Sequence, residues 1–142
     1  MSHYNDLVDE TLDTWSKYPR VRKEHLLNLV KSDRHVMAVA INVFIGQVCN
    51  GGFEQWMGNG YAKPMHATLI SALTLINTPS CPKAIELIKA AAKITRGFTC
   101  DTERCLGDID DLDGKFYEFS DELSKEVEAW FEGFAPAICY EI

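Results

Sequence analysis

The stretch Val36–Gly60, VMAVAINVFIGQVCNGGFEQWMGNG, decides the fold. Its first half, residues 36–48, is apolar on almost every side, and only Asn42, Gly46 and Gln47 interrupt it. A helix that leaves no polar stripe for solvent is a buried helix. The sequence therefore predicts a central helix around which the other elements pack.

This central helix is expected to end at a tight corner, residues 50–53 (Asn-Gly-Gly-Phe). Asn and Gly reach left-handed backbone angles at little steric cost, so they end helices and reverse the chain. Apolar residues at helical spacing then predict a short second helix, which Asn59 and Gly60 end. We assign the turn to the glycines, its anchoring to the aromatic rings and the satisfaction of backbone groups to the amides. The residues of this structural corner are Asn50, Gly51, Gly52, Phe53, Gln55 and Trp56.

Length and composition predict a single domain over residues 1–142. A chain of 142 residues, 46% hydrophobic, can bury roughly two-thirds of the surface that its unfolded form exposes. The N-terminus has no basic and apolar leader, and no apolar run approaches the ~20 residues of a membrane span. An odd number of irregularly spaced cysteines favours free thiols in a reducing compartment over a disulfide framework. We therefore expect a soluble cytoplasmic protein. The cysteines are Cys49, Cys81, Cys100, Cys105 and Cys139.

Helical periodicity continues along the chain and predicts an all-α, compact bundle of about six to eight helices. Apolar steps of three and four predict a helix over residues 4–17, and apolar residues also predict a short helix over residues 21–31 and another over residues 81–94. Ser32 or Asp33 is expected to cap the central helix. Residues 64–76 also suit a strand, but thirteen residues is long for a strand and the neighbours are helical. The clearest period predicts one continuous helix over residues 108–134.

Negative charge is concentrated in that last element. The net charge is −7, but residues 1–100 hold 8 acidic and 11 basic side chains, whereas residues 101–142 hold 13 acidic and 3 basic ones. Such an element disfavours direct binding to nucleic acid or to an anionic membrane. At 100° per residue its carboxylates project opposite the apolar stripe, about one per 5 Å at ~1.5 Å rise per residue. These residues are Asp110, Asp111, Glu118, Asp121, Glu122, Glu128 and Glu132.

The helix over residues 4–17 carries a second, smaller acidic stripe. B-DNA presents one phosphate per ~3.4 Å along each strand, so the C-terminal row alone is sparser than a DNA strand. A substitute for DNA needs a second row, from this stripe or from a symmetry mate. Otherwise both stripes are simply a solvated face that keeps the protein soluble. The second stripe consists of Asp6, Asp9, Glu10 and Asp13.

Two blocks of the sequence resemble a known family. Residues 50–59, NGGFEQWMGN, and residues 112–123, LDGKFYEFSDEL, are similar to segments of small, acidic, all-helical bacterial proteins described as DNA mimics, and the resemblance spans residues 36–131. It implies a non-catalytic inhibitor whose carboxylates occupy the DNA-binding surface of a partner. A transcription regulator, a nucleoid protein or a defence nuclease complex is the implied partner. The resemblance also implies a homodimer.

Other functions leave weaker signals. One alternative is an interaction module that binds through an apolar C-terminal surface, and another is a small enzyme with a pocket at the corner of residues 50–52. A calcium loop fails on register, because with Gly114 sixth the first and twelfth positions fall on Ile109 and Ser120. Cys100 and Cys105 lack a second ligand pair for zinc. We predict no metal, cofactor or catalytic residue. The apolar cluster is Trp130, Phe131, Phe134 and Tyr140.

Overall fold

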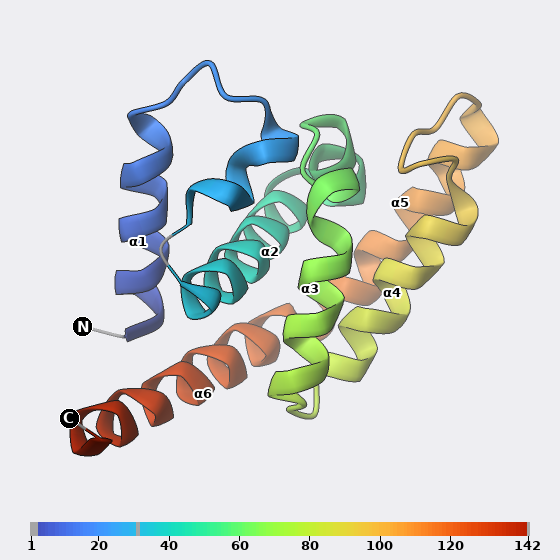
Figure 1. The fold of residues 1–142 in the computed structure, drawn as a ribbon. Helices are drawn as coiled ribbons and strands as arrows, with labels where there is room; N and C mark the ends of the chain where they lie inside the picture. Colours follow the sequence, from blue (N-terminus) through green and yellow to red (C-terminus); the bar gives the residue numbers. More distant parts are fainter. Residues whose placement is uncertain (1–2, 31, 142) are drawn as a thin grey trace.

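The computed structural model describes the backbone of residues 3–30 and 32–141 and the side chains of residues 4–30 and 32–133. Within these ranges the chain forms six α-helices and one 3₁₀ helix and contains no strand, which confirms the predicted fold class (Figure 1). The strand alternative for residues 64–76 is thereby excluded. The elements are α1 (His3–Ser16), η1 (Lys23–Leu29), α2 (Asp33–Gly58), α3 (Ala62–Ile76), α4 (Cys81–Ile94), α5 (Glu103–Tyr117) and α6 (Ser120–Glu141).

Helix α2 is the buried centre of the bundle. It packs against α1, α3 and α5, and less extensively against α6 (Figure 1). Ile41, Phe44 and Val48 are fully buried along it. By length and composition alone, α2 is the one described helix that could cross a membrane, contrary to the expectation that no run approaches that length. Its packing against four other helices identifies it as a core helix.

The interior is dominated by aromatic rings at the junction of α2 and α5. The ring of Phe44 contacts Trp56 and Phe116 edge to face, with centroid distances of 4.9 and 5.2 Å. Phe53 joins them, 6.2 Å from both Trp56 and Phe116. Edge-to-face pairs add about 0.5–1.5 kcal/mol each beyond the burial of their area. This cluster therefore fixes α5 against the corner of α2.

Residues 108–134 form two helices, so the prediction of one continuous helix is wrong. Helix α5 ends at Tyr117, and α6 starts at Ser120. The predicted apolar stripe is buried through Val127, after which Phe131 rather than Trp130 points inward. The bend allows one stripe to follow a curved core, because α5 packs on α2 and α4 whereas α6 packs on α1. Phe134, the last residue of the predicted stripe, lies outside the described side chains.

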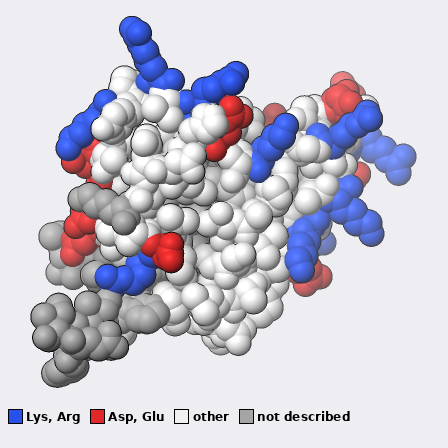
Figure 2. Space-filling model, in the orientation of Figure 1, with Lys and Arg blue, Asp and Glu red and all other residues white. Residues whose placement is uncertain are grey.

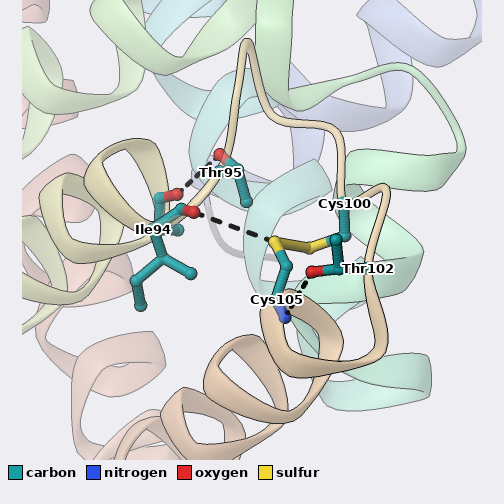
Figure 3. The surroundings of a disulfide bond; sticks show 6 residues. Ile94, Thr95, Cys100, Thr102 and Cys105 are labelled. Atoms are coloured by element: carbon teal, nitrogen blue, oxygen red, sulfur yellow. Dashed lines mark hydrogen bonds between the residues drawn. A yellow bond between two sulfur atoms is a disulfide. The ribbon is translucent and has the colours of Figure 1, made fainter.

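Cys100 and Cys105 form a disulfide, which corrects the prediction of free thiols (Figure 3). Their Cα atoms are 5.4 Å apart, at the start of α5. Thr102 caps the same helix, since its Oγ1 accepts a 3.1 Å hydrogen bond from the Cys105 N–H. Cys49 and Cys81 are free, and Cys139 lies outside the described side chains. The cysteines thus no longer support the expected reducing compartment.

Candidate protein-interaction surface

The carboxylates of α6 lie on its outer side. Asp121, Glu122 and Glu132 are exposed, and Glu128 is half-buried. Asp121, Glu128 and Glu132 recur at spacings of seven and four, which places them on one face of the helix. Lys125 is exposed at the same helical register and reduces the negative charge in the middle of this face. We call Asp121, Glu122, Glu128 and Glu132 the α6 acidic face.

The remaining carboxylates of the predicted C-terminal row do not continue this face in a straight line. Asp110 and Asp111 are exposed on α5, on the other side of the bend at residues 118–119. Glu118 lines a groove of about 650 Å³ between α4 and α5, together with Lys83 and Lys115. The single row expected from a continuous helix is therefore divided into two groups, and Glu118 lies in a groove of mixed charge.

The acidic stripe of α1 approaches the α6 acidic face at one end. Helix α1 packs beside α6, where Asn5 Nδ2 donates a 3.4 Å hydrogen bond to Glu128 Oε1. The ring centroids of Tyr4 and Phe131 lie 5.2 Å apart at the same crossing. Asp9 and Asp13 are exposed and Asp6 is half-buried, and Asp13 forms an exposed ion pair of 3.4 Å with Lys17. Two neighbouring helices thus carry carboxylates on the same part of the molecule.

Glu10 of that stripe makes an interhelical contact. Its Oε2 lies 2.6 Å from Nε2 of the buried His35, and Nδ1 of His35 lies 2.6 Å from Ser32 Oγ. Ser32 is also the N-cap of α2, since its Oγ accepts a hydrogen bond from the His35 N–H. It is one of the two caps that the sequence predicted. The side chains of Ser32, His35 and Glu10 therefore link α1 to the start of α2, and Glu10 is only partly available to a partner.

Two other C-terminal carboxylates act as helix caps, a role that the sequence pattern did not reveal. Asp113 Oδ1 accepts a 2.8 Å hydrogen bond from the Phe53 N–H, which begins the second part of α2. Glu126 accepts 2.8 Å hydrogen bonds from both the N–H and the Oγ of Ser80, at the start of α4. Each contact satisfies a donor that a helix N-terminus leaves without a partner. These acids hold the bundle together and are not available as phosphate substitutes.

The caps shift the pKa values of the two carboxyl groups in opposite directions. Burial raises the pKa of Asp113, against the hydrogen bond from Phe53, and the nearby carboxylates Asp110 and Glu54 raise it further. Burial also raises the pKa of Glu126, but its hydrogen bonds to Ser80 and Thr78 and the nearby Lys83 outweigh burial, so the pKa is lowered. Hydrogen bonds to the charged form dominate at Glu126, whereas loss of solvation dominates at Asp113.

The corner at residues 50–53 is where α5 meets α2. The backbone leaves helical geometry at Gly51 (φ −150°, ψ 20°) and Gly52 (φ 78°, ψ −179°). A Cβ at Gly52 would overlap the carboxylate of Asp113. One turn further along α5, the Tyr117 hydroxyl donates a 2.9 Å hydrogen bond to the Val48 carbonyl, before the corner. Asp113 and Tyr117 thus bind the two sides of the kink.

Side-chain amides cover the exposed side of this corner. Gln47 Oε1 accepts hydrogen bonds from Gln55 at 3.3 Å and from Asn59 at 2.7 Å, and Asn50 donates to Gln55 at 3.0 Å. Phe53 and Trp56 are buried beneath them. The amides of Asn50 and Gln55 thus pair with other side-chain amides, whereas the sequence had suggested that they satisfy backbone groups. Among the described residues, no group of three His, Cys, Asp or Glu side chains could hold a metal ion.

The apolar C-terminal cluster of the alternative interpretation is only partly described. Phe131 is fully buried, and the half-buried Trp130 packs against it with a centroid distance of 5.1 Å. Phe134 and Tyr140 lie outside the described side chains. Phe131 is therefore a core residue and is not available to a partner.

These observations define a small, all-helical protein with carboxylates on the outer sides of α1, α5 and α6. A family model described as DMP19-like protein matches residues 29–134, and the chain belongs to this family of DNA-mimic proteins. The match spans the corner, the division between α5 and α6, and all four residues of the α6 acidic face. Comparisons with curated proteins and with solved structures found no match.

Proposed function

We propose that the protein is a DNA-mimic inhibitor that binds a DNA-binding protein through the α6 acidic face and blocks that protein's access to DNA. The observation that carries the proposal is that this face meets the acidic stripe of α1 at one end, on a chain that belongs to the DMP19-like family. Glu126 of α6 does not belong to this face, because its carboxylate caps the start of α4. The exposed carboxylates Asp121, Glu122 and Glu132 are then left for a partner, and Glu128 is left in part.

A DNA mimic should present negative charges at a spacing similar to that of DNA phosphates. From Asp121 to Glu132 the helix rises about 17 Å at ~1.5 Å per residue, and four carboxylates occupy that length. One B-DNA strand presents a phosphate every ~3.4 Å. A single α6 row is thus sparser than DNA, and the exposed Asp9 and Asp13 on the neighbouring α1 add further negative charge. A homodimer, which we also propose, would double these charges.

The inhibitor acts by occupancy and needs no chemical step, so we propose that it is not an enzyme. The partner presents a basic DNA-binding groove, as in a transcription regulator, a nucleoid protein or a defence nuclease complex. Binding displaces counterions from that groove and therefore weakens steeply as salt rises. We place the interaction in the cytoplasm, where such partners work.

Charge reversal tests the proposal. Replacement of Asp121, Glu122, Glu128 and Glu132 by Lys should abolish capture of the proteins that the unaltered chain retains from host lysate at low salt. A matched control reverses four exposed carboxylates elsewhere, Glu24, Glu54, Glu86 and Asp101, and has the same net charge. Circular dichroism checks that both variants remain helical. Capture of the same proteins by the α6 variant and the control would exclude the α6 acidic face as the binding surface.

A further inference from the structure

A basic pocket lies on a part of the molecule that the proposed function does not use. Its volume is about 380 Å³, and it lies among the start of η1, the turn from α2 to α3 and the loop before α5. Pockets of about 300–1,000 Å³ accommodate small organic ligands. Three cations and one carboxylate line it above an apolar floor. The lining residues that matter are Arg22, Lys23, Glu24, Lys63, Met57 and Phe98.

Phe98, which forms part of the floor of this pocket, is held in place by its neighbours in the core. Phe98 is only 8% exposed, and its ring packs against Trp56 and His66 with centroid distances of 5.9 and 4.7 Å. Its φ is +61°, an uncommon value for a bulky residue that the surrounding structure must enforce. Arg96 and Thr99 exchange backbone hydrogen bonds of 3.3 and 3.2 Å on either side of it. The aromatic floor is therefore preformed.

The rim carries positive charge on a protein whose net charge is −7. Lys23 lines the pocket, and its ammonium donates a hydrogen bond to the Asn59 carbonyl and lies 4.3 Å from the centroid of the Tyr61 ring. Lys63 is exposed and makes no ion pair with the described residues. Arg22 is 3.4 Å from Glu24, the one carboxylate on the rim. Figure 2 shows Lys and Arg side chains along the top and the right-hand side of this face, with Asp and Glu side chains among them.

We propose that this pocket binds a small phosphate monoester with a flat, apolar body. A phosphate dianion suits two or three cations better than a carboxylate does, since it offers more charge and three acceptor oxygens. Phe98 and Met57 offer a surface on which a ring can lie. The anion binds at the rim and the ring against the floor.

Three probes separate the parts of this proposal: AMP, adenosine and inorganic phosphate, each titrated into the full chain and followed by ¹H–¹⁵N NMR. We expect AMP to shift the amides of residues 57–63 and 97–99, with a Kd of about 1 mM or below. Adenosine and phosphate alone should each bind at least about tenfold more weakly, because each keeps only one of the two interactions. Equal affinity of AMP and adenosine would overturn recognition of the phosphate. Equal affinity of AMP and phosphate would overturn recognition of the ring.

Substitutions locate the site. Lys63→Gln should weaken AMP binding by about tenfold, the loss expected for one charge-assisted hydrogen bond. Lys89→Gln, which removes an exposed lysine from α4, makes the same charge change away from the pocket and should leave the affinity unchanged. The proposal fails if AMP shifts no amide around the pocket, or if both variants bind AMP as the unaltered protein does. Neither result bears on the acidic surface, so the two proposals are tested separately.

Discussion

At the scale of single residues, the acidic side chains of the C-terminal segment divide into two groups by their hydrogen bonds. Asp113 and Glu126 accept backbone N–H groups that lie 60 and 46 residues away in the sequence. Those partners come from other helices, so helical periodicity along the segment could not reveal them. What periodicity did separate correctly was the inward stripe, from Ile109 through Val127, from the outward carboxylates.

We predict that Asp113 stabilises the fold mainly by accepting the Phe53 N–H and not through its negative charge. Asp113→Ala removes the acceptor for the Phe53 N–H and should lower the free energy of unfolding by about 1–3 kcal/mol. Asp113→Asn keeps an acceptor oxygen and should cost less. Because the folded pKa is raised above its ordinary value of 3.8, ionisation opposes folding, so the unaltered protein should lose stability relative to the Asn variant as pH rises from 3.8 through the folded pKa. Urea unfolding across this window provides the measurement, and a slope of opposite sign would contradict the assignment.

Glu126 should show the reverse dependence on pH. Its folded pKa is lowered from 4.5, so the stabilisation from its charge is complete above 4.5 and is lost as pH falls through the folded pKa. Glu126→Gln should therefore lower the free energy of unfolding at neutral pH, by about 1 kcal/mol, as a charge-assisted hydrogen bond becomes a neutral one. The difference between the two proteins should shrink in acid. Chemical unfolding at neutral and acidic pH tests this, and a constant difference would refute the charge-assisted cap.

At the scale of elements, the corner of α2 and the bend between α5 and α6 differ in how well sequence predicts them. Gly51 and Gly52 reveal the corner, because a φ of +78° at Gly52 favours glycine. No such residue marks the bend, since residues 117–120 are Tyr-Glu-Phe-Ser and suit a helix. The bend follows the packing of the two helices, because α5 contacts α2 and α4 whereas α6 contacts α1. Local preference is overridden by tertiary contacts there.

The disulfide at the start of α5 should stabilise the fold measurably. Cys100 and Cys105 are five residues apart, and closure of so short a loop is worth about 2 kcal/mol in the chain-entropy description. A reductant should therefore lower the thermal midpoint by about 5 °C for a chain of this size. The Cys100→Ser, Cys105→Ser double variant should not respond to reductant, whereas Cys49→Ser should respond as the unaltered protein does. Identical melting curves with and without reductant would contradict this role.

At the scale of the whole molecule, charge is unevenly distributed along the chain, and the proposed function rests on that distribution. The sequence already located the excess of acid after residue 100 and the excess of base before it. It did not show that the start of α1 packs against α6, which brings one end of the α1 acidic stripe to the α6 acidic face. Nor did it show that Arg22, Lys23 and Lys63 meet at one pocket. Both arrangements depend on contacts between segments distant in sequence.

The oligomeric state bears directly on how closely the surface resembles DNA. We predict a homodimer in solution, because one chain alone carries carboxylates more sparsely than a DNA strand carries phosphates. Sedimentation equilibrium measures the mass directly, and twice the 16.0 kDa of the chain is the expected result. A monomer at every concentration would leave only the α1 and α6 stripes of a single chain to act as the mimic.

Competition with DNA tests the central claim most directly. A partner captured from host lysate at low salt is purified, and its binding to fluorescent duplex DNA is measured by anisotropy while this protein is added. We predict that the protein displaces the DNA completely, that the apparent affinity falls steeply with salt, and that the α6 charge-reversed variant displaces none. A ternary complex, in which the partner holds DNA and this protein together with unchanged anisotropy, would contradict the account.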